Sequence, residues 1–184
     1  CEIDPLVVRT CRKYFPEVSA GLDDPRVRII HEDGAALVRD SSDKFDVILI
    51  DSTDPIGPGA ALFKPEFYRS VKERLSEDGA AVFQTENPLF MEDVFSMAVR
   101  DLMDVFGPAH ARPYLCTVPC YPGGLWSFTF CAKKKDPLKD ALVELPSRLD
   151  SSLRYYNRDV HCAAFALPVF VEKLLGDRHS STTK

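Results

Sequence analysis

The chain has 184 residues, 45% of them hydrophobic and 28% charged, a balance that is ordinary for one globular domain. Its net charge of −5 and sequence pI of about 5.4 argue against binding to nucleic acid or to an anionic membrane. The sequence also holds no apolar run of about 18 residues, the length that a membrane span needs. Negative charge suits a cationic substrate, although a charge of this size is common in proteins that bind none.

Six cysteines are spread along the chain without a C-x-x-C pair, and Cys131 lies inside the apolar run 128–131. This usage is typical of reduced thiols in a cytoplasmic protein, so we predict a cytoplasmic location and no disulfide framework. The four histidines lack the spacing of metal ligands, so we predict no metal. The cysteines are at positions 1, 11, 116, 120, 131 and 162, and the histidines at 31, 110, 161 and 179.

The chain begins with Cys1, and residues 2–4 read as the end of an element that is already under way. We therefore expect this sequence to be a piece of a longer protein.

Apolar and amphipathic stretches alternate through the first half of the chain. Residues 5–15 have helical spacing after an Asp-Pro start signal, and residues 65–75 form a second helix with Pro at its first position. The β-branched run 27–30 predicts a short strand. The almost wholly apolar run 45–50 predicts a strand that is covered on both faces. A third strand, 80–83, is entered through Asp-Gly.

The second half continues the alternation and then changes character. Residues 91–106 predict a long amphipathic helix. Two strands, 109–118 and 125–133, follow each other with only a Pro/Gly-rich loop between them, so we expect them to pair antiparallel at one edge. Beyond these strands we expect a loop-like stretch at 136–152, one or two helices docked on the sheet at 155–175, and a disordered tail at 176–184.

Strands that alternate with helices through short connections predict a doubly wound, Rossmann-like α/β fold with a mostly parallel sheet. We divide the chain into a catalytic domain at 1–135, a helical extension at 136–175 that packs on it, and the tail. In such sheets ligands bind beyond the carboxyl ends of the strands. The chemistry should therefore lie just after each strand.

Polar residues do follow four successive strands at these positions. Taken singly, each of them could merely cap the next helix, and Asp33 or Asp54 could do only that. Taken together on one rim, they predict a ligand site. They are Glu2, the pair Asp33-Gly34, Asp51 and Gln84.

The first two positions suit a nucleoside. Glu2 stands where this architecture holds an acidic residue for ribose hydroxyls. Asp33 can accept from an exocyclic amine of adenine, and Gly34 lets the backbone come close. The spacing alone specifies nothing more exact.

The stretch 51–58 is the most informative part of the chain. Asp51 and Asp54 lie directly after a buried strand, in a segment stiffened by two prolines and turned by a glycine. An ordinary loop with a capped helix would look similar. Two carboxylates that face one cavity would instead bind an ammonium group or a diamine, and could accept its proton.

The turn 117–127 holds Tyr121 and Trp126 among prolines and glycines. The two aromatics could simply pack a hairpin on the core. They could also form a wall beside the amine, with a hydrogen bond from the Tyr hydroxyl and cation–π attraction.

These motifs occur in the order found in spermidine synthases, which the chain resembles from residue 1 to about 175. The D-S-x-D-P-x-G-P stretch, the later P-x-Y-P and the Y-Y-N-x-D-V-H segment are specific in combination. The matching segments are 2–4, 32–34, 51–58, 84–86, 119–124 and 155–161.

The resemblance implies a methyltransferase-like fold and a site for decarboxylated S-adenosylmethionine as co-substrate, with no prosthetic group. It implies that Glu2 holds the ribose, with Ile3 beside it, and that Asp33 and Gly34 meet the adenine. It further implies donor contacts from four other residues: the apolar adenine pocket from Pro58 and Leu62, and contacts from Asp51 and the backbone of Ser52.

The resemblance also implies that Asp51 is the catalytic base and takes the proton of the attacking amine. Asp54, Gln84 and Tyr121 would hold that amine, with Trp126 beside them. The segment 54–62 resembles the loop that closes over both substrates.

Two residues depart from the family pattern without removing a charge from the site: Cys120 stands where Thr is usual, and Cys162 in a segment that more often reads H-R-A-A-F. The larger difference is that the family's glycine-rich G-G-G-D-G-G loop, its first strand and its small N-terminal β domain have no counterpart here. We therefore expect this piece alone to be inactive. The resemblance implies a homodimer or homotetramer for the intact protein.

The reaction implied is transfer of an aminopropyl group to putrescine, which gives spermidine and methylthioadenosine. Other acceptors, namely agmatine, cadaverine or spermidine, remain open. So do putrescine N-methylation, which uses the same motifs with S-adenosylmethionine, and a non-catalytic or inert domain.

Overall fold

The computed structural model describes residues 1–141 and 152–176. They form two compact units, Cys1–Ser42 and Asp43–Lys184, which we describe separately. The predicted division at residue 135 falls inside the second unit and stays a prediction. Of the predicted tail, only Gly176 lies within the described residues; of the predicted loop at 136–152, residues 142–151 lie outside them.

The first unit is made of short helices: α1 (Pro5–Tyr14), α2 (Pro16–Ser19), the 3₁₀ turn η1 (Ala20–Asp23) and α3 (Gly34–Asp40). The predicted first helix is confirmed, and the Asp4 carboxylate caps it by accepting from the Leu6 N–H at 2.8 Å. The predicted strand at 27–30 is wrong. That run belongs to no strand, because its one backbone hydrogen bond to residues 1–4 is Glu2 N–H to Ile30 O at 2.9 Å, and a strand needs a series of such bonds.

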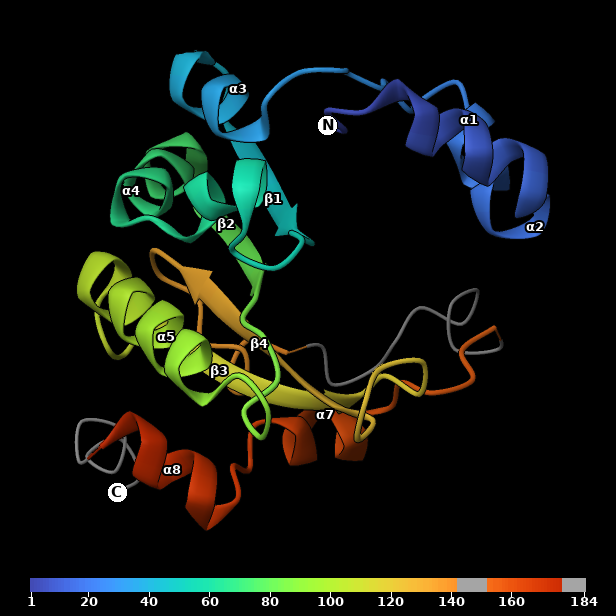
Figure 1. Ribbon diagram of the computed structural model, residues 1–184. Coiled ribbons are helices and arrows are strands. Elements are labelled where there is room, and N and C mark those ends of the chain that lie inside the picture. Colours follow the sequence, from blue (N-terminus) through green and yellow to red (C-terminus); the bar gives the residue numbers. More distant parts are fainter. Residues whose placement is uncertain (142–151, 177–184) are drawn as a thin grey trace. The chain divides into compact units, whose positions relative to one another are not determined.

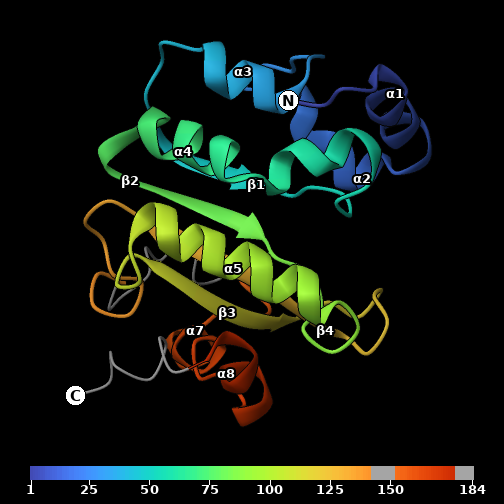
Figure 2. The ribbon, with the colours of Figure 1, turned by 60° about the vertical axis from the view of Figure 1, so that its left-hand side comes forward.

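The second unit is built on one four-stranded sheet, and Figures 1 and 2 show its strands side by side. The strands are β1 (Phe45–Ile50), β2 (Leu75–Gln84), β3 (Ala111–Thr117) and β4 (Leu125–Ala132), in the order β1-β2-β4-β3. β1 and β2 are parallel, and β4 runs antiparallel to both β2 and β3. Three strands therefore share one direction, and the predicted antiparallel edge hairpin is confirmed.

Helices lie on both faces of this sheet (Figure 2). α4 (Pro65–Arg74) and α5 (Glu92–Phe106) lie on one face, while α7 (Arg158–Ala164) contacts β3 on the other and α8 (Val169–Leu175) packs on α5. The core on the first face centres on Phe83, whose ring meets Tyr68 at 5.2 Å and Phe106 at 6.2 Å between centroids. On the opposite face Tyr114 of β3 meets Phe165 beside α7 at 5.1 Å.

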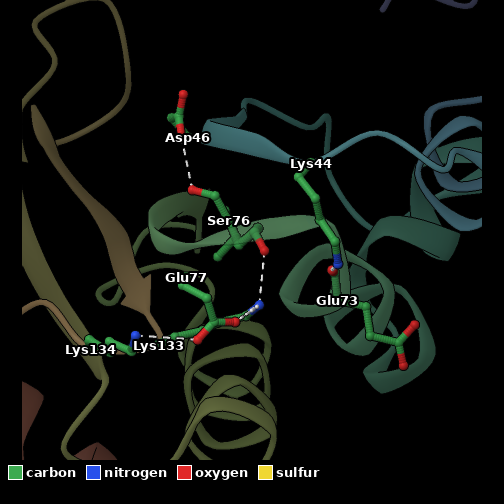
Figure 3. Close-up of polar contacts among 8 residues, drawn as sticks. Lys44, Asp46, Glu73, Ser76, Glu77, Lys133 and Lys134 are labelled. Atoms are coloured by element: carbon green, nitrogen blue, oxygen red, sulfur yellow. Dashed lines mark hydrogen bonds and ion pairs between the residues drawn. The ribbon is translucent and has the colours of Figure 1, made fainter.

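Polar contacts fix the strand register at the end where β2 begins (Figure 3). Ser76 Oγ donates to Asp46 Oδ1 at 2.8 Å. Lys133 Nζ donates to Leu75 O at 2.9 Å and pairs with Glu77 at 3.2 Å. Phe45 pairs with Leu75 and Val47 with Ala80, so residues 76–79 form a bulge in β2. The strand thus starts at Leu75, before the predicted start at residue 80.

Gly79 closes this bulge, and its replacement by Ala is expected to destabilise the second unit. A Cβ at Gly79 would lie 2.9 Å from Phe45 O and 3.0 Å from Ser76 Oγ, so β1 and β2 would have to separate. We expect a loss of about 1–3 kcal/mol in the free energy of unfolding, measured by urea denaturation. Gly21→Ala is the matched control, because nothing lies within 4 Å of its Cβ position. Equal stability of the two variants would contradict this account.

β1 forms one edge of the four-stranded sheet. Its side chains Val47 and Leu49 are 62% and 73% exposed. Parallel strands of this apolar composition are normally covered on both faces. Within the second unit, this apolar face of β1 is therefore largely uncovered. No helix among residues 1–141 and 152–176 is long and apolar enough to cross a bilayer.

Candidate active site

A cavity of about 580 Å³ opens at the carboxyl ends of β1 and β2, within the second unit. Both strand ends contribute polar side chains, and the β3–β4 turn contributes aromatic ones. Every residue predicted from the sequence to hold the amine lines it. The lining residues are Asp51, Ser52, Thr53, Asp54, Ile56, Gln84, Tyr121 and Trp126.

The two aspartates are placed by the segment that leaves β1. Asp51 directly follows the strand, and Asp54 lies in the turn that the Ile56 N–H closes by donating to Asp54 O at 2.6 Å. The next segment passes so close that a Cβ on Gly59 would come within 2.7 Å of Asp54 O, so only glycine fits there. No hydrogen bond within residues 1–141 and 152–176 engages the Asp51 or Asp54 side chain. Both carboxylates are therefore available to a ligand.

Gln84, the last residue of β2, is oriented by two hydrogen bonds with Glu86. Gln84 Nε2 donates to Glu86 Oε1 at 3.0 Å, and the Glu86 N–H donates to Gln84 Oε1 at 2.9 Å. The two bonds fix which end of the amide is oxygen and which is nitrogen. Gln84 is 7% exposed and thus presents a single orientation to the cavity.

Glu86 is a buried acid in an unusual backbone conformation. It is 1% exposed, and its φ of 69° makes it the one non-glycine residue with positive φ in the described chain. Burial raises the pKa of the Glu86 carboxyl, the bond from Gln84 opposes that shift, and the nearby Asp54 charge raises the pKa further. Strained, buried acids of this kind cluster at functional sites.

Hydroxyl groups of Thr85 and of the neighbouring strand β4 hold this strained turn in place. Ser127 Oγ donates to Glu86 O at 2.6 Å, and the Ser127 N–H donates to the same oxygen at 3.1 Å. Thr85 Oγ1 lies 2.9 Å from Ser127 Oγ and 3.3 Å from Thr129 Oγ1. All three hydroxyl residues are fully buried, and each of them has a hydrogen-bond partner within the network.

Tyr121 and Trp126 form the aromatic side of the cavity. Their ring centroids are 4.3 Å apart with planes tilted by 30°. Trp126 is 9% exposed, whereas Tyr121 is 46% exposed. Trp126 thus packs on the core and also lines the cavity, while its role beside an amine stays a prediction.

The residues predicted to meet the nucleoside are split between the units. Pro58 and Leu62 lie in the 3₁₀ turn η2 (Gly57–Phe63) of the second unit and do not line the cavity. In the first unit Glu2 Oε1 accepts from the Asp4 N–H at 2.9 Å, and Ile3 is 55% exposed.

Asp33 caps α3, with its carboxylate accepting from the Ala35 N–H at 2.8 Å, and Gly34 is the first residue of that helix. Capping, the plainer interpretation of Asp33, therefore does occur. The donor-binding roles of these residues remain proposals.

A second cavity of about 440 Å³ lies between the sheet and α7. Its lining is mainly aliphatic and aromatic, and its carboxylates are already used: Asp136 Oδ1 accepts from the Leu138 N–H at 2.9 Å, and Asp140 Oδ2 from the Asp136 N–H at 2.7 Å. Its His161 lies 2.7 Å from Pro137 O and 3.1 Å from the Tyr156 hydroxyl. The cavity at Asp51 is therefore the better site for a cation.

Known proteins resemble this chain along almost its whole length. The profile of the Spermine/spermidine synthase domain matches residues 1–140. The chain belongs to the spermine/spermidine synthase family. The polyamine aminopropyltransferase of Moorella thermoacetica is 48% identical over 95% of this chain and 60% of its own length. That of Thermotoga maritima is 45% identical over 96% of this chain and 59% of its own.

Solved structures agree with this assignment and with the α/β fold. A crystal structure of spermidine synthase in complex with the transition state analogue AdoDATO superposes with a TM-score of 0.87 at 44% identity. It is matched over 96% of this chain and 60% of that chain. The Thermotoga maritima spermidine synthase gives a TM-score of 0.86 at 43% identity. The chain thus spans about 60% of the length of the relatives it matches.

Neither metal ligands nor disulfides contribute to this family member's described structure. Residues 1–141 and 152–176 contain no group of three or more His, Cys, Asp or Glu side chains that could hold a metal ion. All six cysteines are free thiols, and Cys131 is fully buried, which raises its pKa well above the usual value.

Sequence reasoning assigned no role to Glu86 or Asn87. Glu86 lies in the matching segment 84–86, but its position depends on a positive φ that no spacing rule predicts. A usable signal was present: an apolar strand is followed by the polar run 84–87, and all four of these residues are buried. Consecutive buried polar residues need specific hydrogen-bond partners, which fix their positions.

Glu86→Gln is expected to raise the stability of the second unit more at neutral pH than near pH 4.5. The folded-state pKa of Glu86 is raised, so stability contributed by its protonated form is present below the unfolded value and is lost as the pH rises through the folded value. The neutral amide escapes this loss. Urea denaturation of both proteins from pH 4.5 to 7.5 measures the difference.

Glu77→Gln is the matched control, with the opposite sign. Lys133 and Lys134 lower the pKa of the exposed Glu77 from its usual value of 4.5, so wild type should keep its advantage over this variant down to pH 4.5 and lose it only as the pH falls further, where this control is measured. A pH-independent difference between wild type and Glu86→Gln would show that the Glu86 carboxyl does not titrate in this range.

Proposed function

We propose that the protein containing this chain transfers the aminopropyl group of decarboxylated S-adenosylmethionine to putrescine. The putrescine nitrogen forms a bond to the aminopropyl carbon, and the bond from that carbon to the sulfonium breaks. Methylthioadenosine leaves with the electron pair, and the ammonium proton passes to a base. The products are spermidine, methylthioadenosine and a proton.

The shared cavity of Asp51, Asp54, Gln84 and Tyr121 is the observation that supports this proposal most strongly. An alkylamine has a pKa of about 10, so at neutral pH it arrives protonated and is not nucleophilic. It needs negative groups to bind it and one group to remove the proton. Asp51, at the end of β1, is rigidly placed to act as the base, and Asp54 with Gln84 would orient the amine.

On the donor side we propose Glu2 and Ile3 for the ribose, Asp33 and Gly34 for the adenine, and Ser52 with the segment around Pro58 and Leu62 for the rest of the nucleoside. The solved spermidine synthase in complex with the transition state analogue AdoDATO supports a donor-type ligand in this family. A site rich in carboxylates would repel the carboxylate of S-adenosylmethionine, which favours the decarboxylated donor.

Three alternatives differ from this proposal in one part each. Agmatine, cadaverine or spermidine would change only the acceptor. S-Adenosylmethionine as donor would make the protein a putrescine N-methyltransferase. In a non-catalytic protein the cavity would bind a ligand, or none, without catalysing a reaction. Separately, we propose that the 184-residue chain on its own is inactive.

An assay of the full gene product with two donors decides among these functions. Decarboxylated and intact S-adenosylmethionine are each incubated with putrescine and with the three other amines, and the products are identified by mass spectrometry. Spermidine with methylthioadenosine supports the proposal. N-methylputrescine with S-adenosylhomocysteine, or no product from any pair, would reject it.

A cytoplasmic location and a homodimer or homotetramer are part of the same proposal, through the resemblance to spermidine synthases. Light scattering of the purified gene product measures the number of subunits, and a monomer would reject the proposed homodimer or homotetramer.

A further inference from the structure

Asn87 is the most heavily bonded side chain near the cavity, yet it does not line the cavity. It is 1% exposed and stands just beyond Glu86. Its Nδ2 donates to Pro122 O at 3.2 Å and to Leu125 O at 2.9 Å. Its Oδ1 accepts from the Leu89 N–H at 2.8 Å and from the Phe90 N–H at 3.3 Å.

These four partners fix the orientation of the Asn87 amide. A flipped amide would place its NH₂ against two N–H donors and its oxygen against two carbonyl oxygens. The side chain therefore uses both donor hydrogens on one loop and its acceptor on the other. It connects the segment after β2 to the turn between β3 and β4.

A second contact joins the same two loops. The Phe90 N–H donates to Asn87 Oδ1, and the Phe90 ring lies against Gly123. A Cβ on Gly123 would come within 3.0 Å of Phe90 Cε2. Gly123 also has a φ of +75°, which favours glycine. The turn that carries Tyr121 is thus held between Asn87 and Phe90 on one side and its own strands on the other.

We propose that Asn87 is a positioning residue that holds the turn 118–124 so that Tyr121 lies in the cavity with Asp54 and Gln84. This inference rests on the proposed function, because it assigns Tyr121 to the amine. Pro122, which accepts from Asn87, is the direct neighbour of Tyr121, and Tyr121 itself is 46% exposed. Because nearly half of Tyr121 is exposed, its position depends on the backbone beside it and on its ring contact with Trp126.

Asn87→Asp tests this role in the full gene product. The carboxylate still accepts from the Leu89 and Phe90 N–H groups, but it replaces both donations with repulsion toward the carbonyls of Pro122 and Leu125. We expect the KM of the amine to rise about tenfold, since small displacements of binding groups have effects of this size. The KM of the donor should change less than twofold.

Asn157→Asp is the matched control. Asn157 caps α7 only by accepting, from the Val160 N–H at 2.8 Å, a bond that Asp retains. Both KM values should stay within twofold of wild type. Gly123→Ala forms a second test, because it disturbs the Phe90 contact from the other loop and should raise the amine KM in the same selective way.

Trp126 supplies a readout that does not depend on activity. It is the one tryptophan of this chain and its ring lies 4.3 Å from that of Tyr121. In the 184-residue chain, Asn87→Asp should change the fluorescence and near-ultraviolet circular dichroism of Trp126, while Asn157→Asp leaves both as in wild type.

The two readouts separate failure of this inference from failure of the proposed function. Wild-type protein that transfers no aminopropyl group rejects the function, and the Trp126 spectrum then still tests the positioning. The inference is overturned if the amine KM of both Asn87→Asp and Gly123→Ala equals that of wild type. It is also overturned if the KM of the donor and the KM of the amine change equally. An unchanged Trp126 spectrum in Asn87→Asp would overturn it as well.

Discussion

Asp51→Asn in the full gene product is expected to lower kcat about 10²–10⁴-fold and to change the KM of the amine far less. The amide keeps the size of the side chain but cannot accept the ammonium proton. Asp51 lies at the end of β1, a position set by the parallel pairing of Ile50 with Phe83, so the substitution should leave the geometry intact. Steady-state kinetics with varied putrescine at saturating donor separates the two constants.

Asp46→Asn is the matched control on the same strand. Asp46 lies toward the opposite end of β1, where its carboxylate accepts from Ser76 Oγ (Figure 3). The amide oxygen of Asn can still accept from Ser76 Oγ, so this replacement should leave the strand pairing intact and kcat within about twofold. If Asp51→Asn mainly raised the KM of the amine, Asp51 would be a binding group, and the base would have to be sought elsewhere.

The sheet could be predicted because most of its strands are apolar runs bounded by polar or turn-forming residues. The run 45–50 is apolar on both faces and is bounded by Lys44 and Asp51, so its limits were correct. The run 27–30 has the same β-branched character but pairs by a single bond to Glu2, because a strand exists only where a neighbour completes a ladder. At β2 the Asp78-Gly79 signal was interpreted as the entry to the strand, whereas it forms a bulge inside it.

That the residues expected on the amine side line one cavity could also be predicted, because their positions follow from topology. Side chains just beyond parallel strands meet at one edge of the sheet, so Asp51 and Gln84 had to lie close together. Tyr121 and Trp126 could be added through the turn that connects the last two strands. None of these assignments required knowledge of a side-chain conformation.

The supporting residues could not be predicted, because their roles depend on contacts between distant segments. Asn87 bonds residues 35 and 38 positions further along the chain, and Ser127 bonds Glu86 across 41 positions. No local pattern encodes such distances. The left-handed backbone of Glu86 is likewise a consequence of those bonds and not of its own preference.

Asp54→Asn is expected to raise the KM of the amine about 10- to 100-fold and to lower kcat much less. Hydrogen bonds to a charged partner contribute about 1.5–3 kcal/mol, which corresponds to that range in affinity. Asp54 lines the cavity beside Asp51 but is not placed by a strand, so it suits the role of orienting group. Kinetics with putrescine tests the split, and Asp46→Asn again serves as the control.

The same substitution should act on Glu86, because the Asp54 charge contributes to its raised pKa. Removing that charge lowers the pKa of Glu86 toward its usual value, so Glu86 stays ionised to a lower pH. The stability that Glu86→Gln gains at neutral pH should therefore be smaller in the Asp54→Asn background than in wild type, as measured by urea denaturation. An equal gain in both backgrounds would show that the Asp54 charge does not act on Glu86. If kcat falls while KM is unchanged, Asp54 takes part in the proton transfer.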